Sequence, residues 1–120
     1  MKVAFTTSGD NLNALMDSRF ARAQKFLVYD LDTNTFEVID NQKNFNAVHG
    51  AGPQAAETIA KTGARAVITG HCGPNAFRAL TVAGIKIYNT SVGTVAEALE
   101  KYRSGQIPEV ISADVQGHWA

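Results

Sequence analysis

Residues 66–88 read AVITGHCGPNAFRALTVAGIKIY, and this stretch decides the fold. Residues 66–69 are a short run of apolar and β-branched side chains, which predicts a buried strand. The turn that follows, Gly-His-Cys-Gly at residues 70–73, contains Cys72, the only cysteine in the chain. Because the turn leads into a predicted helix, its position favours anions through unpaired backbone N–H groups and the helix dipole.

A helix and a second strand complete this unit. Pro74 suits the first position of the helix predicted over residues 75–83, because a proline there loses no hydrogen bond. Gly84 suits the left-handed residue that ends many helices, and residues 85–88 predict the next strand. The apolar residues available to bury this helix are Phe77, Leu80 and Val82.

The same order of signals occurs once earlier in the chain. Pro53 begins a helix predicted over about residues 54–62, Gly63 ends it, and the strand at residues 66–69 follows. Helices that connect successive strands in this way predict parallel strands joined by right-handed crossovers. A third helix is predicted over residues 94–102, because its apolar residues recur at helical spacing.

The N-terminal third predicts antiparallel strands. Residues 2–6 form the first strand, and residues 26–31 and 35–40 form a hairpin, because the Asp-Thr-Asn link between them is typical of turns. Residues 12–17 predict a loop or one helical turn, and residues 41–46 predict a polar loop. The whole pattern favours an α/β fold, with a mixed five-stranded sheet and about three helices.

Composition limits the classes of protein that the chain can belong to. A length of 120 residues indicates a single domain, 1–120, with a tail of uncertain order from about residue 112. Zero formal net charge gives no support for nucleic-acid binding, and no apolar run is long enough for a membrane span. A lone cysteine cannot form an internal disulfide, so we expect a cytoplasmic protein.

Four glycine-containing turns are candidates for a binding edge. Ligands of open α/β sheets bind beyond the carboxyl ends of the strands. The turns expected there contain Gly9, Gly52, Gly73 and Gly93. Two of these turns precede a predicted helix through a Gly-Pro pair, so they could offer backbone N–H groups to an anion.

Three segments resemble the dinitrogenase iron–molybdenum cofactor biosynthesis family, and the resemblance covers nearly the whole chain. They are HGAGPQAAE at residues 49–57, VITGHCGPNAFRAL at residues 67–80 and AGIKIY at residues 83–88. In addition, RFARA at residues 19–23, followed by FLVY, resembles the family's His-Phe-Gly-Arg-Ala segment before its second strand. The chain departs from that segment at Arg19, where the family often has His, and at Ala21, where it often has Gly.

The resemblance implies a ribonuclease-H-like, three-layer α/β fold. It also implies a carrier of a metal–sulfur cofactor, with protein partners in cluster delivery, and not an enzyme. The family includes NifX-type carriers, the C-terminal part of NifB and the small orange protein. As a compact single domain, the chain is most similar in kind to the last type, which is associated with a molybdenum–copper sulfide cluster. The implied cofactor is such a cluster or a related molybdenum/iron–sulfur cluster.

A sulfide cluster of this kind is a large, soft, multiply charged anion, and the chain offers groups that suit it. Arg19 and Arg22 could supply positive charge, with Phe20 as an apolar wall. The two Gly-Pro turns could supply N–H groups and positive helix ends. The turn residues assigned to the site are Gly50, Gly52, Gly73, Pro74 and Asn75, with His49 and His71 beside them. From spacing alone, the pattern favours ordinary surface charges for the arginines and a core position for Phe20; the family resemblance reverses this preference.

Cys72 has two interpretations. A thiolate is a soft ligand that suits copper or iron–sulfur metals, and a helix N-terminus would favour the thiolate form. A lone cysteine is more often a small buried side chain. One cysteine cannot provide the four thiolates typical of an iron–sulfur cluster. His49 likewise could contact a cluster or cap a helix.

Two other functions compete with a cluster carrier. A phosphate- or nucleotide-binding module could use the same Gly-Pro turns, although the chain has neither a Walker-type run nor Gly-x-Gly-x-x-Gly. A nuclease-type hydrolase of the same fold would need several carboxylates that converge on paired cations. No carboxylate stands at the centre of the strands predicted over residues 2–6 and 66–69.

Overall fold

The computed structural model describes residues 1–45, 50–90 and 93–112. Its five-stranded sheet has the strand order β3-β2-β1-β4-β5. The strands are β1 (Lys2–Thr7), β2 (Lys25–Asp30), β3 (Thr35–Asp40), β4 (Ala64–Thr69) and β5 (Lys86–Asn89). The helices are α1 (Gln42–Phe45), α2 (Ala51–Lys61), α3 (Pro74–Val82) and α4 (Val95–Arg103). Within this described part of the chain, no helix combines the length and the apolar character needed to cross a membrane.

The strand directions give the sheet a common edge. β1 pairs with β2, and β2 with β3, in antiparallel order. β1 pairs with β4, and β4 with β5, in parallel order. The carboxyl ends of β1, β3, β4 and β5 therefore lie at the same edge of the sheet, which we call the carboxyl edge. The predicted mixed five-stranded sheet is confirmed.

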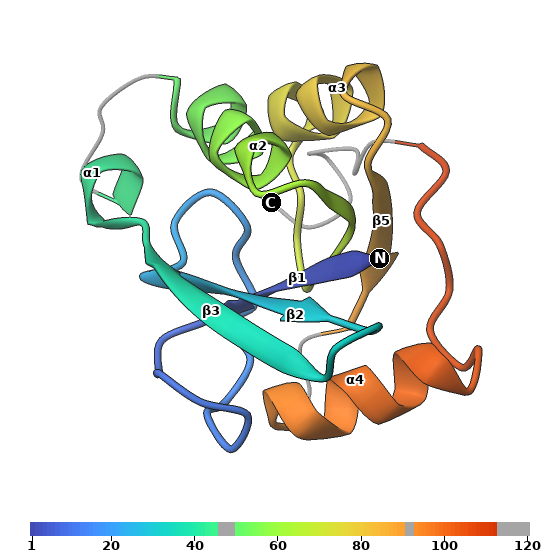
Figure 1. The fold of residues 1–120 in the computed structure, drawn as a ribbon. Helices are drawn as coiled ribbons and strands as arrows, with labels where there is room; N and C mark the ends of the chain where they lie inside the picture. The colour runs from blue at the N-terminus through green and yellow to red at the C-terminus, as the bar shows by residue number, and fades with distance from the viewer. Residues whose placement is uncertain (46–49, 91–92, 113–120) are drawn as a thin grey trace.

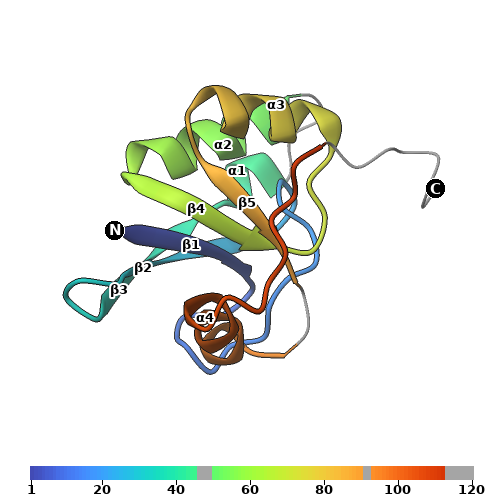
Figure 2. The same cartoon turned by 90° about the vertical axis from the view of Figure 1, so that its right-hand side faces the viewer.

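Helices cover both faces of the sheet. α2 and α3 lie side by side on one face, and α4 crosses the other (Figures 1 and 2). Side chains alternate along β1, so Ala4 belongs to the core under α2 and α3, whereas Val3 and Phe5 belong to the core under α4. The result is a three-layer α/β fold with a separate core on each side of the sheet.

The hairpin and the crossovers follow their predicted signals closely. Residues in β2 and β3 pair in register from Lys25 with Asp40 to Asp30 with Thr35. Asn34 in the connecting turn has φ 58°, a conformation that asparagine tolerates well. Pro74 is the first residue of α3, as predicted, and Gly84 after that helix has φ 78°. These local signals were sufficient to place β2, β3 and α3.

The prediction of a polar loop over residues 41–46 was wrong, because one helical turn, α1, occupies Gln42–Phe45. The chain therefore has four described helices and not three. The residues of α1 are mostly polar and show no apolar periodicity, so an amphipathic pattern does not reveal this helix. The missed signal is Asp40, whose carboxylate accepts a hydrogen bond from the Gln42 backbone N–H at 2.8 Å. α2 also begins earlier than predicted, at Ala51, with Pro53 in its first turn.

Val82 does not contribute to the core, contrary to prediction, because 84% of its surface is exposed. The buried residues of α3 are Ala76 and Leu80, which are one helical turn apart. Val82 follows Leu80 by two positions, so it points to the opposite side of the helix. Phe77 is only partly buried.

We expect Thr94→Ala to lower the free energy of unfolding by about 1 kcal/mol, as for loss of other N-caps. The Thr94 hydroxyl accepts a hydrogen bond from the Glu97 backbone N–H at 3.2 Å, and the Glu97 carboxylate accepts one from the Thr94 N–H at 2.8 Å. The second bond lowers the pKa of Glu97 below its usual value. Urea unfolding measures the effect. Thr94→Ser keeps the hydroxyl and serves as the control; an equal loss in both variants would contradict the capping role.

Candidate functional site

The segment of residues 17–23 crosses the carboxyl edge, from the end of β4 toward the end of β3. Arg19 forms a parallel bridge with His71. The Phe20 N–H donates to the His71 carbonyl at 3.0 Å, and the His71 N–H donates to the Ser18 carbonyl at 2.6 Å. This pairing places Arg19 beside the turn that precedes α3. Residues 17–23, 50–53 and 71–75 form the surface that we call the rim.

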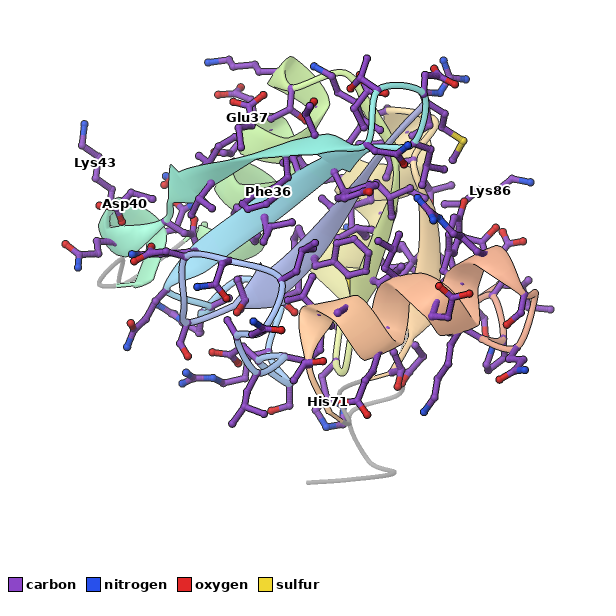
Figure 3. All side chains as sticks on the ribbon, turned by 60° about the horizontal axis from the view of Figure 1, so that its bottom comes forward. Phe36, Glu37, Asp40, Lys43, His71 and Lys86 are labelled. Carbon is purple, nitrogen blue, oxygen red and sulfur yellow. The ribbon has the colours of Figure 1, made fainter. Side chains whose placement is uncertain are left out.

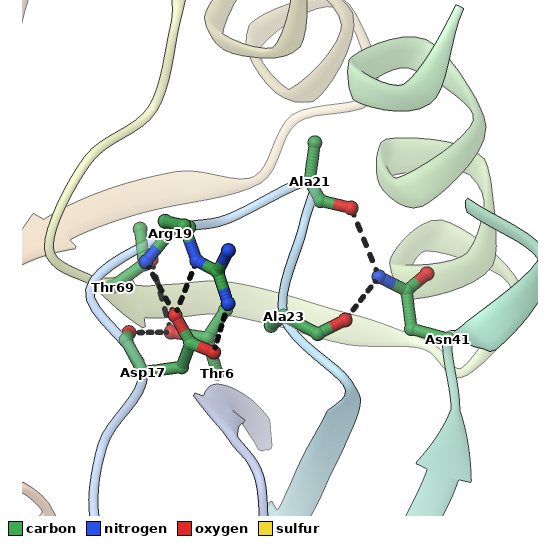
Figure 4. A network of polar contacts seen from close by, with 7 residues as sticks. All are labelled: Thr6, Asp17, Arg19, Ala21, Ala23, Asn41 and Thr69. Atoms are coloured by element: carbon green, nitrogen blue, oxygen red, sulfur yellow. Dashed lines mark hydrogen bonds and ion pairs between the residues drawn. The ribbon is translucent and has the colours of Figure 1, made fainter. Parts of the chain in front are cut away.

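Buried threonines hold the first end of the segment. The Thr6 hydroxyl is hydrogen-bonded to the Asp17 carbonyl at 2.7 Å and to the Thr69 hydroxyl at 3.0 Å (Figure 4). The Asp17 N–H donates to the Thr6 carbonyl at 2.8 Å. Thr6 and Thr69 are the penultimate residue of β1 and the last residue of β4. The sheet itself therefore fixes where the segment begins.

Asp17 orients Arg19. One carboxylate oxygen of Asp17 accepts from the Arg19 backbone N–H at 2.8 Å and from its Nε at 3.2 Å. The other oxygen accepts from Nη2 at 3.2 Å. These hydrogen bonds, followed by the charge of Asp17, raise the pKa of Arg19. The side chain of Asp17 is 11% exposed and that of Arg19 is 53% exposed, so the guanidinium is held at the surface.

Asn41 holds the other end of the segment. Its buried side-chain amide donates to the Ala21 carbonyl at 3.0 Å and to the Ala23 carbonyl at 2.7 Å (Figure 4). Arg22 lies between these two residues, and its Nη1 donates to the Asn44 carbonyl in α1 at 3.2 Å. The segment is therefore fixed from β1 and β4 on one side and from the end of β3 on the other.

The N-terminus of α3 adjoins the segment through the pairing of Arg19 with His71, and the N-terminus of α2 adjoins that of α3. Among the described residues, no side chain caps either helix. α2 follows Gly50 and α3 follows Gly73, and neither helix has an acidic residue in its first turn. α4, in contrast, begins with a complete capping box. The first N–H groups of a helix need partners from outside the helix. α2 and α3 therefore present backbone donors and positive helix ends at the rim.

Gly52 allows the two N-termini to lie close together. A Cβ atom built on Gly52 would lie 3.1 Å from both the Cβ and the backbone N of Ala76 in α3. This spacing is tighter than side-chain contacts normally allow, and one of the two neighbours is backbone. The close approach brings the positive ends of two helices to one place, which strengthens their combined attraction for an anion.

We expect Gly52→Ala to lower the free energy of unfolding by about 1–3 kcal/mol, the usual cost of overpacking. The added methyl group would push α2 away from α3. Gly73→Ala is the matched control, because a Cβ there meets nothing within 4 Å and the backbone at φ −65° suits alanine. Urea unfolding of both variants measures the difference. A Gly52→Ala protein as stable as Gly73→Ala would contradict the steric argument.

The structure brings most of the predicted site residues to the rim. Arg19 and His71 are paired, and Gly73, Pro74 and Asn75 follow directly at the start of α3. Gly50 and Gly52 lie at the start of α2, and Arg22 reaches α1. His49 is outside the described residues, as is the tail from residue 113.

Phe20 is a core residue and does not form an exposed wall, contrary to the interpretation from the family resemblance. Only 1% of its surface is exposed, and its ring lies 5.7 Å from the ring of Phe26. The segment has to bury one side chain to stay attached to the sheet, and Phe20 is the apolar residue that it offers. Of the two interpretations of Phe20, the core residue is the correct one.

Cys72 is also buried, with 3% of its surface exposed, among apolar side chains under α2 and α3. A metal held at the surface of the rim could reach its sulfur only if the turn moved. Among the described residues, no three His, Cys, Asp or Glu side chains are grouped so that they could hold a metal ion. The described part of the rim offers hydrogen-bond donors and positive charge in place of a ligand set.

Sequence reasoning missed the residues that support the arginines. Asp17 could have been found, because an aspartate two residues before an arginine often accepts its backbone N–H in a tight turn. Thr6, Thr69 and Asn41 have no local signal, because their partners lie in other strands or loops. Only the folded chain reveals them.

Known proteins resemble the chain in sequence and in fold. The sequence matches the family described as dinitrogenase iron-molybdenum cofactor over residues 1–105. The apo form of the orange protein from Desulfovibrio gigas is similar, with 39% identity and a TM-score of 0.92 over 95% of this chain and 96% of that chain. A NifB-type protein from Thermotoga has 32% identity and a TM-score of 0.85, and covers 96% of this chain and 97% of its own.

More distant structures share the fold alone. A dinitrogenase-type protein from Methanocaldococcus jannaschii has 19% identity and a TM-score of 0.73 over 93% of this chain and 96% of that chain. No curated protein sequence matches the chain.

The family match spans most of the sequence and includes all three segments of the rim. The chain therefore belongs to the dinitrogenase iron-molybdenum cofactor family.

Proposed function

We propose that this protein binds a molybdenum-containing metal–sulfide cluster at the rim, and carries it or helps to assemble it, without catalysing a reaction. Membership of the dinitrogenase iron-molybdenum cofactor family supports a role with such clusters. The likeness to the orange protein and to a NifB-type protein supports it further. The cargo is a molybdenum–copper sulfide cluster or one that resembles the iron–molybdenum cofactor, and proteins that deliver or accept it are the expected partners.

One observation carries the proposal: the segment with Arg19 and Arg22 pairs with the turn before α3, whose N-terminus adjoins that of α2, and among the described residues no side chain caps either helix. A thiometallate anion accepts hydrogen bonds through its sulfur atoms and carries several negative charges. Each charge-assisted hydrogen bond contributes roughly 1.5–3 kcal/mol. Several together would reach the roughly 8 kcal/mol that corresponds to micromolar binding.

Burial of Cys72 favours noncovalent holding over a metal–thiolate bond. An anion held by amides and guanidinium groups can leave without breaking a coordinate bond, which suits a carrier. Such binding depends on charge, so it weakens as salt concentration rises. A cluster ligated by protein sulfur would be far less sensitive to salt.

The test is a visible absorption titration with tetrathiomolybdate and copper(I), followed by gel filtration. We expect charge-transfer bands that elute with the protein and that decrease in high salt. Colour found only in the small-molecule fraction would contradict the proposal. ATP and inorganic phosphate at the same ionic strength are the comparison ligands. Displacement of the colour by either at micromolar concentration would favour the phosphate- or nucleotide-binding alternative.

A further inference from the structure

We propose that Asn41, supported by Asn44, is a positioning residue for Arg22 in the cluster site. The inference rests on the proposed function, because it assigns Arg22 a role in holding the anion. Asn41 would not touch the anion. It would act by fixing the backbone on both sides of Arg22, while α1 receives the guanidinium group of Arg22.

The contacts of Asn41 are specific to the residues that flank Arg22. Its Nδ2 donates to the Ala21 carbonyl at 3.0 Å and to the Ala23 carbonyl at 2.7 Å, so both amide hydrogens are used. Asn41 is 3% exposed. Buried hydrogen bonds of this kind are stronger than exposed ones and are costly to break. The Arg22 backbone is therefore held from both sides by a single side chain.

Asn44 connects the same cluster to the arginine side chain. Its buried Nδ2 donates to Asn41 Oδ1 at 2.9 Å, so the Asn41 amide has partners on both its nitrogen and its oxygen. The Asn44 backbone carbonyl accepts from Arg22 Nη1 at 3.2 Å. The two asparagines thus fix the backbone of Arg22 and one end of its guanidinium group together. A long arginine side chain loses much conformational entropy on binding, and such prior fixing reduces that loss.

Arg19, the other arginine of the rim, is held by a different set of hydrogen bonds. Arg19 is oriented by the Asp17 carboxylate, and Asp17 is anchored through Thr6. The side chains that hold Arg19 are different from those that hold Arg22. Loss of Asn41 should therefore affect Arg22 and leave Arg19 in place, so the two can be separated by mutation.

A double-mutant cycle tests the proposal, with tetrathiomolybdate alone as the probe. Asn41→Leu keeps the approximate shape of the side chain, removes its hydrogen bonds and adds no charge. We expect Asn41→Leu to weaken binding about fivefold in the wild-type background and less than twofold in the Arg22→Ala background. Such coupling is the signature of two residues that act as one unit. Equal weakening in both backgrounds would overturn the proposal and leave Asn41 a merely structural residue.

Two further variants keep the test decisive. Asn44→Ala retains the carbonyl that receives Arg22 and removes the support of Asn41, so we expect a smaller loss that also disappears with Arg22→Ala. It replaces Asn41→Leu if that variant does not fold. Thr6→Val loosens the other end of the segment, and any loss of affinity it causes should persist in the Arg22→Ala background.

If Arg22→Ala itself leaves binding unchanged while Arg19→Ala weakens it, the positioning role fails and the proposed function stands. If neither arginine matters, the proposed function fails.

Discussion

Replacing Arg19 and Arg22 together by alanine is expected to weaken the binding of tetrathiomolybdate by about 100-fold. Removal of each arginine would cost the complex one charge-assisted hydrogen bond, which contributes roughly 1.5 kcal/mol, the lower end of the usual range. The lower end applies because the Arg19 side chain is 53% exposed and solvent screens its charge. About 1.4 kcal/mol corresponds to a tenfold change in affinity, so the pair gives about two orders of magnitude.

The matched control for this variant is Arg65→Ala with Lys86→Ala, which removes the same net charge. Arg65 and Lys86 lie at the starts of β4 and β5, so they are at the opposite edge of the sheet from the rim. Figure 3 shows Lys86 and His71 at different ends of the molecule. We expect the control to change affinity less than threefold in 0.15 M salt, because screening limits charge effects to about 8 Å. Equal losses would mean that overall charge and not the rim holds the anion.

Cys72→Ala distinguishes anion holding from thiolate ligation. If the cluster is held by amides and guanidinium groups, this variant should bind within about twofold of the wild type, because the sulfur is buried. It should be less damaging than the double arginine variant. The reverse order of losses would favour direct ligation by the thiolate. Equilibrium titrations on all three proteins, under anaerobic conditions, give the comparison.

Much of the fold could be predicted because its signals are local. A turn of Asp-Thr-Asn between two β-rich runs determined the hairpin, and Pro74 with Gly84 marked both ends of α3. Each of these depends on the conformations that one or two residues allow. Where the signal was a side chain that caps the next segment, as at Asp40, the apolar pattern alone was insufficient and α1 was missed.

The site could be predicted only in part, for a physical reason. Helix N-termini are visible in the sequence, since Gly-Pro pairs mark them, and topology brings both to the carboxyl edge. The role of Phe20 depends on which side of a loop faces the sheet, and no periodicity exists in a loop to show this. The positions of Thr6 and Asn41 next to the arginine segment depend on pairing between distant strands. Such long-range contacts have no signature in a single sequence.

Phe20→Ala is expected to lower the free energy of unfolding by about 3–5 kcal/mol, the usual cost of truncating a buried phenylalanine. This would be a large fraction of the 5–15 kcal/mol that stabilises a typical domain. The Phe20 ring is buried against Phe26, and its backbone N–H is paired with His71 at the end of β4. Loss of the ring would leave a cavity under the rim. Urea unfolding followed by circular dichroism measures the change.

Phe20→Leu separates the structural role of this residue from any contact with the anion. Leucine refills most of the cavity, so we expect a loss of only about 1–1.5 kcal/mol in stability. Because the Phe20 ring is buried in the core, the leucine protein should bind tetrathiomolybdate within about twofold of the wild type. A loss of affinity as large as that of Arg19→Ala, in a protein that remains folded, would mean that the aromatic ring reaches the anion and that the segment rearranges on binding. Near-wild-type affinity would mean that Phe20 anchors the loop and that the neighbouring arginines do the binding.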